Sequence, residues 1–195
     1  MLKLKRGCTV PFPEKLKEEY EVNGNWIAAN INADKFLNLL LYFINIHDEP
    51  MFFILEIPTN RQNEKLENGV YHKDVYYIDG CSREEAVAIL DRVGELLTDD
   101  GLCQFGFGCH ESQDEIMIGK YNIVTLLSKN TDDYRDFFQE NGIFKADKIV
   151  TAWDTFSQEH FGISESCEVN GERIYDIPEI FKDWGIYFAE QREDT

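Results

Sequence analysis

Cysteine and histidine side chains in residues 103–110 are the first candidates for chemistry, because thiolates and imidazoles are the usual ligands of zinc. Cys103, Cys109 and His110 lie in this segment. Further ligands would come from elsewhere in the chain, and the candidates are Cys81, Cys167 and His160. Consecutive residues of a strand point to opposite faces, which separates Cys109 from His110, and the sequence lacks the paired C-x₂₋₄-C spacing of structural zinc sites. We therefore expect no metal and no other cofactor, with Cys103 and Cys109 as small core residues.

Two fragments of known motifs overlap the same segment, and both are incomplete. His110-Glu111 begins like the H-E-x-x-H zinc-protease motif, but Asp114 stands at the final position and the motif requires a helix. Gly106 and Gly108 begin like the G-x-G-x-x-G dinucleotide motif, but Glu111 stands where the third glycine is needed. The sequence contains neither a G-x-S-x-G elbow nor a P-loop. These departures favour a binding role over catalysis.

Strict alternation along residues 103–110 predicts a β-strand with two different faces. The first face holds Cys103, Phe105, Phe107 and Cys109, and the second holds Gln104, Gly106, Gly108 and His110. The first face is expected to lie in the core, whereas the second is nearly bare. A ligand site is expected, if the chain has one, over Gly106, Gly108 and His110. A helix packed on the glycines is the competing interpretation.

The periodicity of the chain predicts an α+β fold in a single domain spanning residues 1–195. A strand meander at about 103–127 is expected at the centre of a mixed, largely antiparallel sheet. Flanking helices are expected at about 33–46, 83–97 and 132–140, the second with a capping box from Ser82 to Glu85. A continuous apolar run at 51–57 predicts a buried strand.

Less regular segments complete the predicted fold. We expect a short helix at 13–20, a strand at 148–153, a hairpin about Asn170-Gly171 and a closing strand at 186–189. Residues 59–70 are polar and are expected to form a mobile loop. Residues 1–22 begin with a basic stretch, so a peripheral N-terminal segment is an alternative to full integration in the domain.

The composition limits the classes of function. The net charge is −18, and 43% of the residues are hydrophobic. The hydrophobic content excludes disorder of the whole chain, and the negative charge disfavours nucleic acid and anionic membranes as partners. The most apolar stretch, residues 36–46, is too short to span a bilayer. The five scattered cysteines and the lack of a secretory signal predict a cytoplasmic protein with reduced thiols.

Charge and the incomplete motifs together predict an acidic protein-binding module for a basic partner. In charge, size and lack of catalytic motifs, the chain resembles small acidic bacterial inhibitors, such as immunity proteins that neutralise cationic nuclease toxins. This resemblance concerns overall properties and assigns no residues. The candidate partner-binding residues are Asp99, Asp100, Glu111, Asp114, Glu115, Trp153 and Asp154. The alternatives are an enzyme or small-ligand protein with its site over Gly106, Gly108 and His110, and a charge that serves solubility alone.

Overall fold

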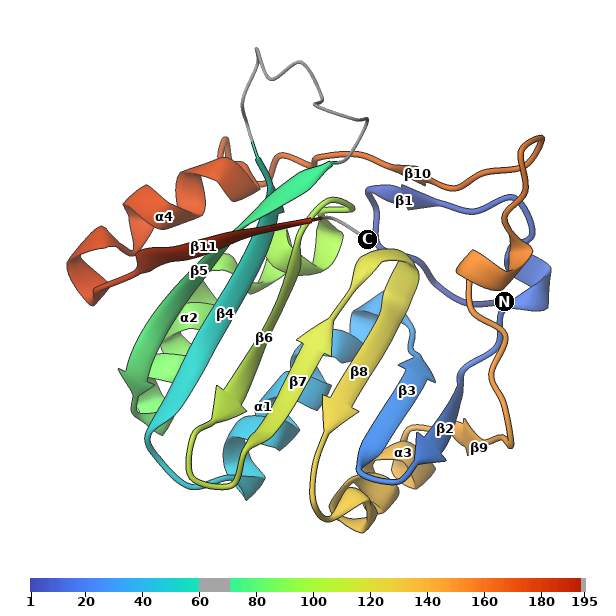
Figure 1. Cartoon of the computed structure of the whole chain (residues 1–195), viewed down its shortest axis with the longest axis horizontal. Helices are drawn as coiled ribbons and strands as arrows, with labels where there is room; N and C mark the ends of the chain where they lie inside the picture. Colours follow the sequence, from blue (N-terminus) through green and yellow to red (C-terminus); the bar gives the residue numbers. More distant parts are fainter. Residues whose placement is uncertain (60–70, 194–195) are drawn as a thin grey trace.

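A nine-stranded sheet forms the body of the molecule in the computed structural model, which describes residues 1–59 and 71–193 (Figure 1). From one edge to the other, its strands are β11 (Tyr187–Glu193), β5 (His72–Cys81), β4 (Met51–Pro58), β6 (Gln104–Cys109), β7 (Asp114–Ile118), β8 (Ile123–Leu127), β3 (Trp26–Asn30), β2 (Glu19–Asn23) and β9 (Phe144–Lys145). Neighbouring strands are antiparallel except β2 and β9. A separate ribbon pairs β1 (Cys8–Thr9) with β10 (Ile163–Ser164).

The helices confirm the predicted fold class. They are α1 (Phe36–Ile46), α2 (Arg83–Asp99), α3 (Arg135–Glu140) and α4 (Ile177–Ile180). Strands β6, β7 and β8 form the predicted antiparallel meander, and α1 and α2 lie behind the sheet in Figure 1. The capping box between Ser82 and Glu85 is present at the start of α2. Within the described ranges, no helix has the length and apolar character needed to cross a membrane.

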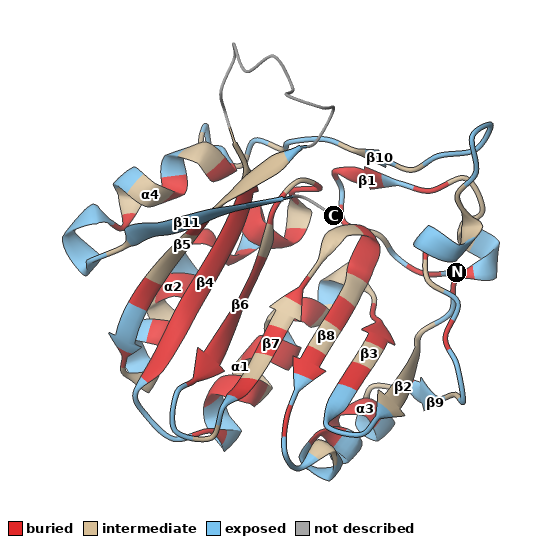
Figure 2. Cartoon of the chain, in the orientation of Figure 1, coloured by how far each residue is buried: buried red, intermediate tan, exposed pale blue. Residues whose placement is uncertain are grey.

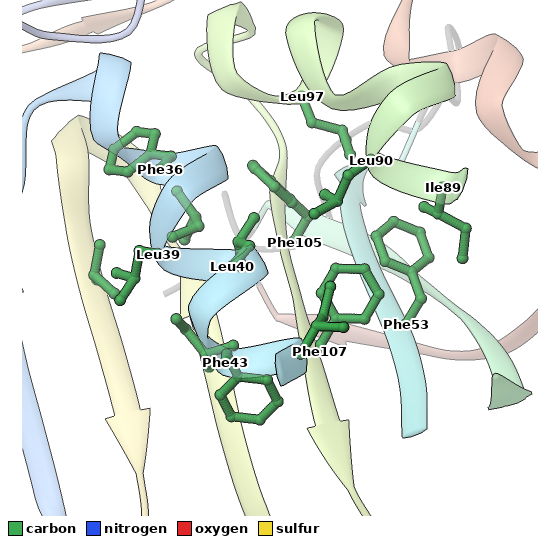
Figure 3. Close-up of a cluster of buried hydrophobic side chains, with 14 of the residues drawn as sticks. Phe36, Leu39, Leu40, Phe43, Phe53, Ile89, Leu90, Leu97, Phe105 and Phe107 are labelled. Atoms are coloured by element: carbon green, nitrogen blue, oxygen red, sulfur yellow. The ribbon is translucent and has the colours of Figure 1, made fainter. Parts of the chain in front are cut away.

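The main core lies between these two helices and the face of the sheet turned toward them. Phe53 of β4 and Phe105 and Phe107 of β6 pack beneath Leu40 of α1 and Leu90 of α2 (Figure 3). The ring centroids of Phe53 and Phe107 are 5.4 Å apart across the β4–β6 pair. Burying one large apolar side chain contributes about 1.5–3 kcal/mol, so this layer is a major source of stability.

Residues 1–22 are integrated in the fold. The sequence alone leaves a peripheral segment open as an alternative and predicts a short helix at 13–20. Strand β2 lies inside the sheet, and the only helical turn before it is a 3₁₀ turn at Pro13–Lys15. Lys5 is 1% exposed: its ammonium donates to the carbonyl oxygen of Cys103 at 3.2 Å and lies 5.2 Å from the centre of the Phe105 ring. Pairing with β3 therefore decides the structure of this segment, not local helix propensity.

The prediction of a strand at 148–153 is wrong. This segment is a loop that leads into a 3₁₀ turn at Trp153–Thr155. The backbone N–H and the hydroxyl of Thr151 both donate to Oδ2 of Asp154, at 2.8 and 2.7 Å, and these local bonds favour a turn over an extended ladder. The mobile loop predicted at 59–70 lies, apart from its first residue, outside the described residues.

The C-terminal turn and strand follow the prediction more closely. Val169 and Glu172 form an isolated antiparallel bridge, and Asn170 and Gly171 between them have φ values of 53° and 82°. Two positive φ values in succession are the signature of a type I′ turn. The predicted closing strand is β11, which extends to Glu193 and pairs with β5 at the edge of the sheet.

Three buried polar side chains, His47, Asp114 and Tyr134, connect the end of α1 to β7 and to the turn before α3. Nδ1 of His47 lies 3.4 Å from Oδ2 of Asp114, and Nε2 lies 2.8 Å from the hydroxyl of Tyr134. All three residues are buried. Burial lowers the pKa of His47 from its ordinary value of 6.5, although the charge of Asp114 acts in the opposite direction. The folded protein therefore favours a neutral His47, in which the nearby Asp114 carboxylate favours the proton on Nδ1 and Nε2 accepts from the hydroxyl of Tyr134.

Stability should therefore fall when the pH drops below 6.5. The unfolded chain binds a proton at His47 at a higher pH than the folded chain does. The contribution of His47 to the free energy of unfolding is therefore complete above pH 6.5, and it decreases as the pH falls toward the lower pKa of the folded state. The loss is at most about 1.4 kcal/mol per pH unit. Urea unfolding of the wild type and of His47→Gln between pH 7.5 and 5 measures it. Identical pH slopes for the two proteins would contradict this role of His47.

Candidate functional site

The candidate functional site is the face of the sheet turned away from α1 and α2, which we call the open face. In Figure 1 the strands β4, β6, β7 and β8 lie in front of these helices, and no described helix lies over them. Buried residues alternate with half-buried residues along β7 and β8, which marks the two faces (Figure 2). Its central residues are Phe52, Glu56, Tyr77, Gly106, Gly108, Glu115, Met117, Tyr187 and Arg192.

Four rings form a continuous aromatic strip across this face. His110 follows β6 and lies 4.7 Å from Phe52 of β4, measured between ring centroids. Phe52 lies 5.6 Å from Tyr77 of β5, and Tyr77 lies 6.3 Å from Tyr187 of β11. The strip, defined by these four residues, is exposed at both ends: the side chain of His110 is 65% exposed, and Tyr187 is 45% exposed. Phe52 in the middle of the strip is 8% exposed, so His110 and Tyr187 are the rings available to anchor a partner.

Carboxylates border both ends of the strip. Asp79 of β5 connects the two ends, because Oδ1 lies 3.2 Å from Nε2 of His110 and Oδ2 accepts from the hydroxyl of Tyr187 at 2.5 Å. Glu111 is exposed in the turn after His110, and Glu115 lies opposite Gly108 on the neighbouring strand. The border therefore places negative charge around an apolar centre, as a surface for a cationic partner requires.

A buried ion-pair cluster lies beside the strip. Glu56 of β4 is 5% exposed and receives Nζ of Lys73 at 2.6 Å and Nη1 of Arg192 at 3.1 Å. Burial raises the pKa of Glu115, the charge of Glu56 raises it further, and Arg192 opposes this rise. No hydrogen bond to another described residue involves the Glu115 carboxylate. Glu115 is thus a half-buried carboxyl group with a raised pKa, and a cation placed beside it would stabilise its charged form.

The two glycines of the predicted ligand site are places of close packing. A Cβ atom at Gly108 would overlap the ring of Phe52, and one at Gly106 would overlap the carbonyl oxygen of Ile116. The space over Gly108 is therefore filled by an aromatic ring of the protein itself. The competing interpretation from the sequence, a helix packed on the glycines, is therefore wrong in its element, because groups of β4 and β7 occupy this space.

Replacing Gly108 with alanine should destabilise the protein by about 1–3 kcal/mol, because the added methyl group meets a ring that is held between two strands. The double variant Gly108→Ala/Phe52→Leu should recover part of this loss, since the smaller side chain leaves room. Chemical denaturation of the three proteins, with Thr125→Ala on the same face as a control, checks the contact. A Gly108→Ala variant as stable as the wild type would show that the ring does not occupy this space.

Two of the predicted docking acids lie in the interior. Asp100 is fully buried: Oδ1 accepts from the backbone N–H of Leu102 and Cys103 at 2.8 and 3.0 Å, and Oδ2 accepts from that of Cys167 at 2.8 Å. Asp114 is 8% exposed and faces His47. Both carboxylates stabilise the fold, so we remove them from the candidate docking residues.

The remaining acids do not form one patch. Asp99 precedes β6 and pairs with Nε of Arg6 at 3.3 Å, whereas Glu111 and Glu115 lie at the other end of that strand. A strand of this length spans roughly 20 Å, so the two groups are separate. Glu115 and the glycine face do come together, because Glu115 pairs directly with Gly108. One predicted partner-binding residue, Glu115, thus lies beside the predicted ligand site on the open face.

Trp153 and Asp154 lie away from the aromatic strip. Trp153 is 52% exposed and packs edge-on against Tyr121, with ring centroids 5.0 Å apart. It lines a small cavity of about 120 Å³ together with Gln104 and Met117 of the open face. Hydrogen bonds from Thr151 lower the pKa of Asp154, which acts as a local cap. Trp153 therefore extends the open face, whereas Asp154 supports the turn.

The cysteines that the sequence analysis considered as zinc ligands, and then assigned to the core, contact backbone carbonyl oxygens. Sγ of Cys103 contacts the carbonyl oxygen of Leu97 at 3.5 Å, and Sγ of Cys109 contacts that of Asp48 at 3.4 Å. Within residues 1–59 and 71–193, no three histidine, cysteine or acidic side chains are grouped to hold a metal ion. Burial raises the pKa of Cys103 to about 12, so this thiol is an inert core group.

Sequence reasoning missed the residues that organise the open face. Glu56, Lys73, Tyr77 and Arg192 come from three strands that are distant in sequence. The available signal was Glu56 itself, a single acid inside the apolar run of residues 51–57. A charged residue at a strand position with burial on both faces requires a partner.

Comparison with known proteins gives no relative: no family model, no curated protein and no solved structure matches the chain. The candidate role of the open face therefore rests on its own residues.

Glu111 of the β6–β7 turn and Asp114, the first residue of β7, should differ in their effect on stability when they are substituted. Asp114→Ala should destabilise the protein by about 1–3 kcal/mol, because it leaves buried His47 and the N–H of Lys129 without their acceptor. Glu111→Ala should change stability by no more than about 0.5 kcal/mol, since its side chain is exposed. Thermal or urea unfolding measures both. Equal effects would mean that the burial of Asp114 has no energetic consequence.

Proposed function

We propose that this chain is a protein-binding module that docks a basic partner on its open face. The observation that carries the proposal is the aromatic strip, open at His110 and Tyr187 and bordered by Asp79, Glu111 and Glu115. Rigid aromatic side chains provide affinity at an interface, and surrounding charges steer the encounter and select the partner.

The net charge of −18 supports a cationic partner. A field of this sign accelerates association with basic proteins and repels phosphate groups, so neither nucleic acid nor an anionic membrane is part of the proposal. A nuclease toxin has a suitable cationic surface where it holds its own phosphate-containing substrate. An inhibitor or immunity protein acting in the cytoplasm is therefore one form that this function would take.

The enzyme and small-ligand alternative is not favoured by the packing at Gly106 and Gly108. A ligand over these residues would have to displace the ring of Phe52, which contacts His110 and Tyr77 on either side. The half-buried Glu115 remains compatible with either role, but its position beside an open strip suits a lysine or arginine side chain of a partner.

The experiment compares capture of basic proteins by three purified forms of the chain. The first is the wild type, and the second is Glu111→Lys/Glu115→Lys, which reverses two charges beside the strip. The third is Asp132→Lys/Asp136→Lys, a control with the same change in charge on exposed residues of the turn before α3 and of α3 itself. Captured proteins are identified by mass spectrometry, and association rates are then measured at several salt concentrations.

We expect a basic protein that binds the wild type and the control but associates at least about tenfold more slowly with Glu111→Lys/Glu115→Lys. Its association rate with the wild type should fall steeply as salt rises, because screening acts over about 10 Å at 0.1 M salt. Equal losses in the two charge-reversal variants would show that only net charge matters. Equal binding by all three forms would reject the open face as the docking surface.

A further inference from the structure

A separate cleft lies on the other side of β5, between the end of β4 and the segment around α4. It has a volume of about 420 Å³. Its walls combine aromatic, proline and charged side chains, namely Asp74, Tyr76, Tyr175, Pro178, Glu179 and Lys182. Tyr76 and Tyr77 are consecutive in β5, so this cleft and the aromatic strip open on opposite sides of the sheet.

The electrostatics of the cleft favour a positive ligand. It contains two carboxylates, Asp74 and Glu179, and one ammonium, Lys182, which pairs with Glu179 at 3.2 Å near the solvent. Burial raises the pKa of Tyr76, and Asp74 raises it further. Burial also raises the pKa of Tyr175, with further increases from Asp100 and Asp74. Asp74, Tyr76 and Tyr175 all line the cleft, so a cation within it has a carboxylate and two aromatic rings among its neighbours.

The hydrogen bonds of Asp74 leave one of its oxygens available. Oδ1 accepts from Oγ1 of Thr59 at 2.7 Å and from Nε2 of Gln191 at 3.0 Å. These donors come from the chain beyond β4 and from β11, and they fix the orientation of the carboxylate. Among the described residues, Oδ2 has no hydrogen-bond donor, and it is the acceptor that the inference assigns to the ligand.

From this arrangement we infer that the cleft is a binding site for an organic cation, a guanidinium or alkylammonium group on an apolar stem. The carboxylate of Asp74 accepts the charged group, the phenol rings of Tyr76 and Tyr175 contact its faces, and Pro178 contacts the stem. Cations bind favourably over aromatic faces, and charge-assisted hydrogen bonds are the stronger ones. The volume exceeds that of one arginine side chain, so the ligand is a free amine or guanidine compound, or an arginine or lysine residue with its flanking backbone.

This inference does not depend on the proposed docking function, because the two surfaces share no residue. The probe is Nα-acetyl-L-arginine amide, and its matched control is Nα-acetyl-L-citrulline amide, which has nearly the same shape without the charge. Binding is followed through the ring resonances of Tyr76 and Tyr175 in the whole chain with ¹³C-labelled tyrosine. A five-residue peptide with a central arginine serves as a third ligand.

The arginine probe should shift both tyrosine resonances in a saturable manner, and the citrulline control should bind at least about tenfold more weakly. Asp74→Asn keeps the acceptor for Thr59 and Gln191 and should reduce affinity for the arginine probe by about tenfold. Asp183→Asn removes an exposed charge outside the cleft and should leave affinity unchanged.

Tighter binding of the peptide than of the free probe would identify a protein side chain as the ligand, and equal binding would identify a small molecule. Equal binding of the arginine and citrulline probes to the wild type would overturn the inference, even if Asp74→Asn does not fold. The inference would also be overturned if the arginine probe shifted the tyrosine resonances of Asp74→Asn and Asp183→Asn equally. Failure of the chain to bind any basic protein would leave this result unaffected and would count only against the proposed function.

Discussion

Burial of one face of the central strands beneath α1 and α2 is the constraint on which the rest of the structure depends. Phe53, Phe105 and Phe107 all project to that side and are fully buried. Because side chains alternate along a strand, this choice fixes which residues of β4, β6 and β7 face the other way. Phe52, Gly108 and Glu115 are on the open face as a direct consequence.

Close packing on the open face then produces its aromatic strip. The missing side chain at Gly108 allows the ring of Phe52 to lie against β6, and that ring connects His110 to Tyr77. The ion pairs of Glu56 with Lys73 and Arg192 join β5 and the edge strand β11 to β4, and Tyr187 of β11 lies at the end of the strip. The buried carboxylate of Glu56 thus holds the edge strand β11 in position, and the aromatic contacts of the strip extend onto that strand.

The sequence was sufficient for the parts of the fold that local periodicity determines. Alternation in residues 103–110 and the Ser82 capping box correctly located β6 and the start of α2. The sequence was insufficient where long-range pairing determines the structure. A helix was expected at 13–20, but Glu19 and Tyr20 belong to β2, which pairs with β3. The burial of individual acids could not be predicted either. Asp100 follows Asp99 and Asp114 precedes Glu115 in the sequence, and only the fold brings the N–H of Cys167 to Asp100 and that of Lys129 to Asp114.

Hydroxyl-radical footprinting of the chain with and without its captured basic partner tests the central claim most directly, because it maps which side chains lose contact with water. The open face predicts protection of Tyr187 and Tyr77 in the complex, with unchanged reactivity at Tyr42, which lies on α1 behind the sheet. Protection of Tyr42 without protection of Tyr187 would place the partner on the helical side and would contradict the account.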